Sequence, residues 1–245
     1  MQDDLYRIFK YTIEFYLKRL RLIQIFSIPF ILAFGILALV PAPTYMSLGG
    51  VFLRTGSIPE LSILDLLITA AAYAIAVFVV ADTIVNINLI VRSKRTFTET
   101  KKEMVDAIGK YATRIFYIYT LVLLLLVIVQ LLIYEFPFQN WIYPIFSLLL
   151  SFLLFYVAPA VVIDHSDTAH AIKRSIYVAL KAPHLILVWI LIGLFCTSFL
   201  KVTGDLVFSS TYSGYFVLLV NSLIVLPFLT VLQTQMYMEK YPLAR

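Results

Sequence analysis

Charged residues are scarce in this sequence. Of its 245 residues, 13% are charged and 62% are apolar, whereas a water-soluble domain has about 25% charged and about 45–50% apolar residues. Water does not solvate a surface this apolar, so the composition excludes an ordinary soluble fold. The sequence therefore predicts an integral membrane protein, in which lipid covers the apolar side chains.

The residues from which many catalytic and metal sites are built are also scarce. There is one cysteine, Cys196, which excludes an intramolecular disulfide and a metal site built from cysteines. The sequence has no Gly-x-Ser-x-Gly elbow, no glycine-rich phosphate loop and no His-Glu-x-x-His zinc pattern. We therefore expect no enzyme activity, no cofactor and no bound metal.

Six apolar runs are each close to or above the length of about 20 residues that a helix needs to cross a bilayer. They cover approximately residues 22–40, 58–91, 115–134, 141–163, 183–199 and 215–237, and the last has a proline, Pro227, at which we expect a kink. The predicted fold class is therefore all-α, a polytopic membrane protein. We treat residues 1–245 as a single integral membrane domain.

The polar segments between these spans have charged residues on one side and apolar residues on the other when they are drawn as helices. Residues 3–21 are the clearest case, and residues 97–114 and 166–181 show the same pattern. Such amphipathic helices lie at the membrane interface, with the apolar face in the acyl boundary and the basic face toward anionic headgroups. The side chains that we expect to bind headgroups are Lys10, Lys110, Lys173, Arg174 and Lys181.

Positive charge is concentrated on one side of the predicted spans. Of the 19 Lys and Arg residues, all but Arg54 and Lys201 lie in the N-terminal segment, in the two long polar segments or in the C-terminal tail. Because positive loops stay in the cytoplasm, we expect both termini to be cytoplasmic and the spans to form three hairpins, each preceded by a cytoplasmic amphipathic helix. Topology accounts for the net charge of +5, so we expect membrane lipids and a cytoplasmic or membrane protein as partners, and no nucleic acid.

The same unit, an amphipathic helix followed by two spans, occurs three times, in residues 3–91, 97–163 and 166–238. The three amphipathic helices carry Ile8-x-Lys10-Tyr11, Ile108-x-Lys110-Tyr111 and Ile172-x-Arg174-Ser175 at matching places. Two interpretations stay open: a threefold internal repeat, or the similarity that any hairpin protein with basic cytoplasmic loops shows. The distinction matters because repeat interfaces in membrane proteins often hold binding sites.

One motif resembles a known family. Pro159-Ala160 closes a span and is followed by Asp164, by Ala171-Ile172-Lys173-Arg174-Ser175 and by Ala182-Pro183-His184. This order resembles a broad prokaryotic family of six-span membrane proteins, similar to the membrane domain fused to some glycerophosphoryl diester phosphodiesterases. The resemblance implies a six-span fold in a prokaryotic plasma membrane. No phosphodiesterase barrel accompanies it, so no catalytic activity is implied.

Two groups of polar residues are candidate sites. Asp164, Asp167 and His170 are residue types that bind metal ions, but an aspartate at this place is also the expected N-cap of the following helix. Asp82 and Asn86 lie one turn apart in the second span, with Asn221 in the sixth. They are either packing and hydrogen-bonding residues or the lining of a transport pathway.

These observations favour a non-enzymatic membrane protein that binds anionic lipid headgroups and organises the membrane or partner proteins. The alternative is a permease-like transporter subunit with a polar pathway along the second span.

Overall fold

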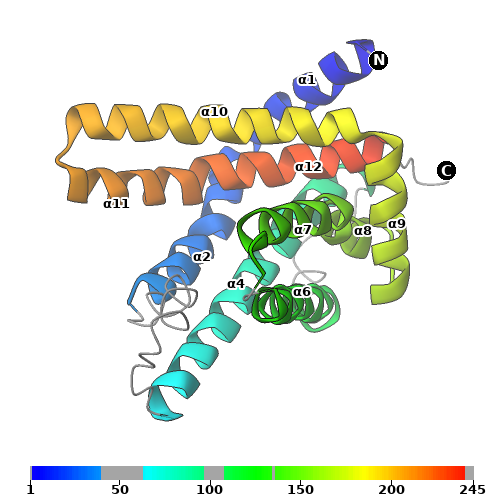
Figure 1. Ribbon diagram of the computed structural model, residues 1–245. Coiled ribbons are helices and arrows are strands. Elements are labelled where there is room, and N and C mark those ends of the chain that lie inside the picture. Colours follow the sequence, from blue (N-terminus) through cyan, green and yellow to red (C-terminus); the bar gives the residue numbers. More distant parts are fainter. Residues whose placement is uncertain (1, 40–62, 97–107, 134–135, 241–245) are drawn as a thin grey trace.

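The computed structural model describes residues 2–39, 63–96, 108–133 and 136–240, which form helices and short turns with no strand among them (Figure 1). The helices in chain order are α1 (Gln2–Lys18), α2 (Leu20–Leu39), α4 (Ile63–Thr96), the π-helical turn η1 (Ile108–Ala112), α6 (Thr113–Leu132), α7 (Gln139–Leu153), α8 (Val157–Ile163), α9 (Thr168–Lys181), α10 (Pro183–Val207), α11 (Ser210–Val220), the π-helical turn η2 (Asn221–Val225) and α12 (Leu226–Lys240).

Five helical stretches are long and apolar enough to cross a membrane. They are Leu67–Ser93, Gly109–Leu132, Gln139–Ile163, Pro183–Val207 and Tyr212–Lys240, and a sixth is counted if the bent pair α1 and α2 forms one span. The chain is therefore an all-α, multi-pass membrane protein, as its composition and apolar runs predict. The long predicted loop 41–60 and most of the second predicted surface helix lie outside the described residues.

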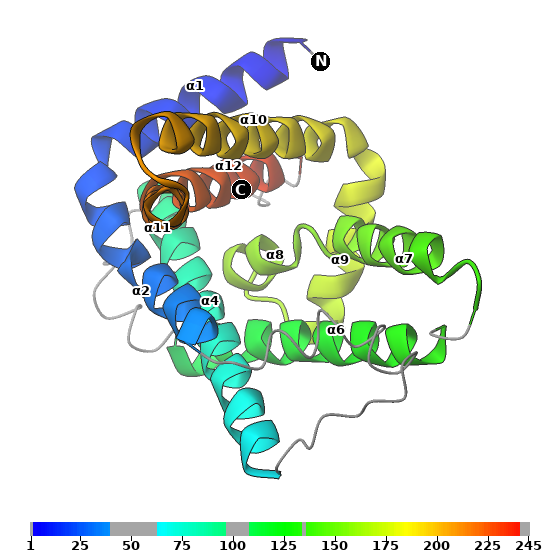
Figure 2. The same ribbon diagram turned by 60° about the vertical axis from the view of Figure 1, so that its left-hand side comes forward.

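The long helices are arranged as three hairpins that diverge from a common base, the region around α8 and α9. α2 pairs with α4, α6 with α7, and α10 with α11 and α12. In Figure 1 the turn between α10 and α11 is at the left, while α6 is seen nearly along its axis and α7 is seen obliquely. In Figure 2 the turn between α6 and α7 is at the right, and α8 and α9 lie at the base. The arrangement has one hairpin per predicted repeat unit, and the repeat itself stays a prediction.

α1 lies across the base and packs on protein. It meets α2 at a bend of 87°, which places the predicted surface helix at a steep angle to the first span. The Tyr16 ring packs edge-to-face on Phe228 of α12, with centroids 5.5 Å apart, and the Tyr16 hydroxyl donates to the Ile224 carbonyl at 2.9 Å. An ion pair between Arg7 and Glu239 ties α1 to the end of α12. Part of the apolar face that was expected in the acyl boundary is therefore covered by protein: Ile8 and Tyr16 are buried, whereas Leu5 and Phe9 are half-buried.

The fourth predicted span, 141–163, is broken into α7 and α8. Pro159 explains the break, because proline has no N–H to donate to the carbonyl four residues earlier and its ring clashes with that carbonyl. The residue four positions earlier is Phe155, and its carbonyl accepts a hydrogen bond from the Gln233 amide of α12 instead. A side chain from another helix therefore replaces the helical bond that proline removes.

Ser175 of α9 is the hydrogen-bond partner of two further backbone groups at this break. Its hydroxyl donates to the Leu153 carbonyl at 2.8 Å and accepts from the Tyr156 N–H at 3.0 Å. Non-helical backbone at membrane depth is tolerated only where protein or water satisfies it. Ser175 and Tyr156 are both fully buried, so protein supplies the partners here.

The fifth span is longer than predicted and ends at Val207 rather than near Phe199. Gly204 lies inside α10 at the point where α11 comes close, and a Cβ there would meet the Ser213 hydroxyl at 2.8 Å. Ser213 also donates to Asp205 at 2.6 Å, and Asp205 pairs with Lys201 at 2.7 Å. This polar contact holds the hairpin together near its turn, which explains why the helix continues through the glycine.

The sixth span changes helical register just before the predicted kink. The π-helical turn η2, Asn221–Val225, separates α11 from α12 and comes two residues before Pro227. A π turn accommodates residues that do not fit the α-helical bonding pattern. It also presents the Ile224 carbonyl to Tyr16.

Candidate functional site

The candidate site is the corner between α8 and α9, residues 162–170, at the base from which the hairpins diverge. It follows a short helix, α8, all seven of whose residues are buried. The last carbonyls of a helix have no partner within the helix, so a buried helix end must find partners elsewhere. The contacts around the corner show how this chain provides them.

Asp164, directly after α8, is a buried carboxylate. Its side chain is 3% exposed, and its Oδ2 accepts from Arg174 of α9 at 2.9 Å and from the Tyr237 hydroxyl of α12. A buried carboxylate is stable when a cation and hydrogen-bond donors surround it. Asp164 therefore joins α8, α9 and α12 at one point.

Three arginines from three helices converge on this corner. Arg92 at the end of α4 donates to the Val162 carbonyl at 3.4 Å, and Arg114 at the start of α6 donates to the Ser166 carbonyl at 2.8 Å. Arg174 also donates to the Ser166 hydroxyl, at 3.0 Å. Cations stabilise the negative end of a helix dipole, so Arg92 stabilises the carbonyl end of α8. Arg92 and Arg114 together join α4 and the start of α6 to the corner.

His165 forms the turn of the corner. Its φ angle of 52° lies in the left-handed region, which costs energy for a residue other than glycine. A hydrogen bond joins its Nδ1 to the Tyr111 hydroxyl of η1, and the two rings lie 5.5 Å apart between centroids. The contact with Tyr111 therefore fixes the turn and attaches the π-helical start of the third span to it.

Asp167 caps α9, which is one of the two roles predicted for this group. Its Oδ1 accepts from the His170 backbone N–H at 3.3 Å and contacts the His170 Nδ1 at 2.6 Å. The His170 side chain, above all by its hydrogen bond, holds the pKa of Asp167 below its usual value. Asp164, the other predicted cap, faces inward to Arg174 instead. Among the described residues no three His, Cys, Asp or Glu side chains lie close enough together to hold a metal ion.

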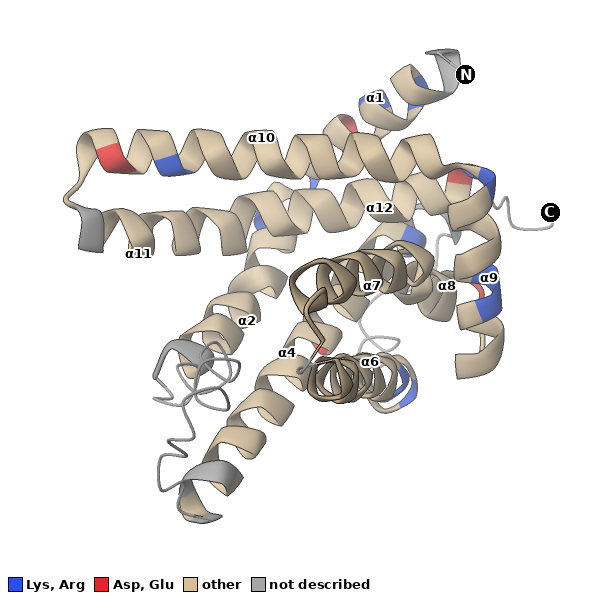
Figure 3. Ribbon diagram, viewed as in Figure 1, with Lys and Arg blue, Asp and Glu red and all other residues tan. Residues whose placement is uncertain are grey.

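The predicted headgroup-binding residues divide into two kinds. Lys110, Lys173 and Lys181 are exposed: Lys110 precedes α6, Lys173 is in the second turn of α9, and Lys181 is at the end of α9 opposite the corner. Lys110 and Lys181 lie 5.5 Å from the ring centroids of Tyr111 and Tyr177 respectively. Lys10 is exposed on α1. Arg174 differs from the prediction, because its guanidinium contacts Asp164 and Ser166. Figure 3 shows the basic residues of α9 and of the start of α6 on the same side of the molecule.

The polar residues of the second span do not meet Asn221. The Asn86 amide donates to Asp82 on its own helix at 3.1 Å, while Asn221 begins η2 and is partly exposed. A polar contact between the second and sixth spans does exist, but it joins the buried residues Asn88 and Thr234. One Asp82 oxygen is buried without a hydrogen-bond partner in the part of the chain that the structure describes.

No sequence pattern predicted that Arg92, Arg114 and Tyr237 contact this corner. The contact of Gln233 with the break before α8 was not predicted either. Arginines at the ends of spans have an ordinary role in topology, and an aromatic residue at the end of a span is typical of the headgroup belt. The available signal was Pro159 within an apolar run, because a proline there requires a partner for the carbonyl four residues earlier.

Comparisons with protein-family models, with curated proteins and with solved structures give no match for this chain. The resemblance to the six-span prokaryotic family therefore stays a prediction. Function is therefore inferred from the geometry of the corner and from the charge near it.

Proposed function

We propose that this chain is a non-enzymatic protein of a prokaryotic plasma membrane that binds anionic lipid headgroups at the α8–α9 corner and thereby organises the surrounding membrane or a partner protein. The corner would lie at the cytoplasmic interface, with both termini on the same side, as the distribution of Lys and Arg indicates.

The observation that supports this proposal is an excess of exposed cations on η1 and along α9, the elements that meet at a corner whose own acids already have partners. Asp164 is paired with Arg174 and Asp167 with His170. Lys110, Lys173 and Lys181 are exposed, and their charge is not needed for either acid. A lysine near an anionic membrane surface contributes about 1 kcal/mol to its attraction, so the three together favour anionic lipids over neutral ones.

The proposal is tested by lipid retention in a mixed bilayer. Protein purified in nanodiscs of equal phosphatidylglycerol and phosphatidylcholine is delipidated in steps, and the retained lipids are counted by native mass spectrometry. We expect phosphatidylglycerol to be enriched, and the triple variant Lys110→Gln, Lys173→Gln, Lys181→Gln to lose most of the enrichment. Lys201→Gln, at the far end of α10, is the matched control and should keep it.

Enrichment that is equal in the triple variant and in the control would contradict the proposal. Raising the salt concentration gives a second check, because exposed charges are screened within about 8 Å at physiological ionic strength. Headgroup selectivity due to these lysines should therefore fall at high salt, whereas selectivity due to chain length should not.

A permease-like transporter subunit is the second candidate, and one observation favours it. A buried carboxylate oxygen without a partner, as in Asp82, is uncommon within a span and is often functional. Uptake of protons or small cations into proteoliposomes that is saturable, and that Asp82→Asn abolishes, would support transport. Leakage equal to that of empty liposomes would exclude these ions as cargo.

A further inference from the structure

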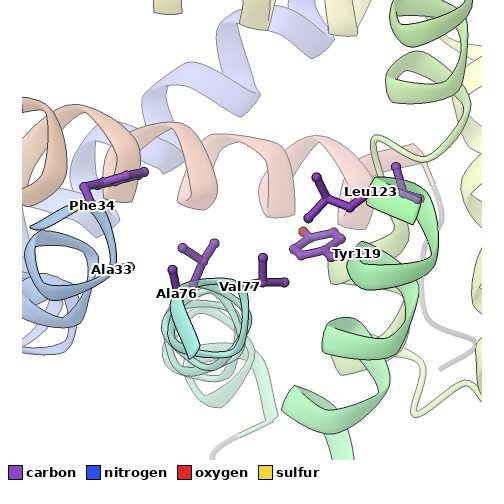
Figure 4. Close-up of a pocket in the computed structure, with 8 residues that line it drawn as sticks. Ala33, Phe34, Ala76, Val77, Tyr119 and Leu123 are labelled. Atoms are coloured by element: carbon purple, nitrogen blue, oxygen red, sulfur yellow. The ribbon is translucent and has the colours of Figure 1, made fainter. Parts of the chain in front are cut away.

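A cavity of about 270 Å³ lies between α2, α4 and α6, away from the α8–α9 corner. Figure 4 shows Phe34 reaching over it from α2, Ala76 and Val77 from α4, and Tyr119 from α6. The lining side chains are apolar apart from the Tyr119 hydroxyl, which points toward the gap between α2 and α4. The cavity therefore excludes an ion or a strongly polar ligand, which would lose its hydration without gaining partners.

The packing of the three helices explains why the space remains. Ala33 and Ala76 are 0% and 1% exposed, and their small side chains let α2 and α4 approach each other closely. α6 is held on α4 by the edge-to-face contact of Phe78 and Phe116, whose centroids are 5.7 Å apart. Tyr119 follows one turn later, where the two alanines offer no side chain long enough to fill the space.

The cavity is continuous with the lipid-facing surface. Residues adjacent in sequence to its lining are strongly exposed and apolar: Leu32 at 59%, Ile75 at 53% and Leu121 at 66%. In a multi-pass membrane protein such residues are covered by lipid chains. An empty apolar space beside them would lose dispersion contacts on one side, and a lipid chain is the apolar molecule present there at high concentration.

We propose that this cavity binds one acyl chain of a membrane phospholipid, independently of its headgroup. With a volume of about 270 Å³, the cavity accommodates a segment of an acyl chain rather than a whole lipid. Tyr119 lies six residues after Thr113, or about 9 Å along α6 at 1.5 Å per residue. The site is therefore at the depth of the chains and below the headgroups.

The test uses a neutral lipid, so that it is independent of the headgroup proposal. The protein is placed in phosphatidylcholine nanodiscs that contain a phosphatidylcholine with a diazirine in the middle of one chain, and adducts are mapped by peptide mass spectrometry after irradiation. We expect the peptides that contain Phe34 and Tyr119 to be labelled at least threefold more than those with Leu149 of α7 or Leu194 of α10, which are exposed to lipid.

Filling the cavity should remove this excess. Val122→Phe adds volume to a lining residue, whereas Leu121→Phe places the same ring on the exposed side of α6. The first should lower labelling of the α2 and α4 peptides at least threefold, and the second should leave it unchanged. Val77→Phe fills the cavity from α4 and repeats the experiment if Val122→Phe fails to elute as a single folded species.

Labelling that is uniform over all lipid-exposed helices would overturn the proposal, as would excess labelling that persists in both filled variants. Loss of phosphatidylglycerol enrichment in the lysine variants would leave the expected result unchanged.

Discussion

The ion pair between Asp164 and Arg174 allows a quantitative prediction. Arg174→Gln removes the cation from a carboxylate whose side chain is 3% exposed. Removing one partner of a buried pair costs about 3–5 kcal/mol. The Tyr237 hydroxyl remains bound to Asp164, and Arg174 itself is 35% exposed. We therefore expect the lower end of the range, about 3 kcal/mol.

The expected loss of stability is large enough to measure. For a chain of this size, about 2–4 °C per kcal/mol converts it into a fall in Tm of about 6–12 °C. The measurement is thermal unfolding of detergent-purified protein, followed by fluorescence-detected size exclusion. Lys173→Gln changes an exposed neighbour on the same helix, so its effect should stay within about 0.5 kcal/mol.

A double variant tests the reason for the loss. Asp164→Asn removes the buried charge and keeps an oxygen for Tyr237. If the unpaired carboxylate causes the loss, Asp164→Asn with Arg174→Gln should be more stable than Arg174→Gln alone. The reasoning is refuted if Arg174→Gln is no more harmful than Lys173→Gln, or if the two substitutions at the pair are simply additive.

Two further predictions concern local structure. Gly204→Ala should destabilise the α10–α11 hairpin by about 1–3 kcal/mol, because its Cβ would meet Ser213. Gly214→Ala should be neutral or slightly stabilising, because no atom lies within 4 Å of the new Cβ. Equal Tm values for the two variants would contradict this prediction. His170 lowers the pKa of Asp167, so the contribution of Asp167 to stability is present above the unfolded pKa of about 3.9 and is lost as the pH falls through the lower folded pKa. Asp167→Ala should abolish this part of the pH dependence of Tm. If the fall of Tm at acid pH is the same in the variant, the cap is not linked to protonation.

Local patterns in the sequence were sufficient for the helices, because periodicity and run length depend on neighbouring residues. Five spans, the helix at 168–181 and the cap at Asp167 follow from signals within one or two turns, and the first predicted span is found as α2, which is bent by 87° from α1. The exposure of Lys110, Lys173 and Lys181 was predictable for the same reason, because it follows from the local pattern of charged and apolar residues. Long apolar runs did not reveal the break in the fourth span, since every residue of α8 is apolar and only its proline departs from a continuous helix.

Local sequence patterns could not predict the residues that contact the corner and the break before α8. Asp164 and Tyr237 are 73 residues apart, and Phe155 and Gln233 are 78 apart. Two of the residues in the motif, Arg174 and Ser175, were interpreted as part of a surface helix, although their side chains point inward to Asp164 and to the break before α8. A helical pattern shows which residues share a face, but the neighbour that covers this face is decided by tertiary packing.

The break between α7 and α8 has a consequence for how the chain is made. When the fourth span leaves the ribosome, Ser175 follows in the next helix, α9. Gln233, in α12, is still to be synthesised. The Phe155 carbonyl therefore has no protein partner during this interval, and lipid cannot provide one. Water must therefore bind this carbonyl until α12 is in place, and in a nascent chain arrested before Gln233 the break before α8 should stay accessible to water.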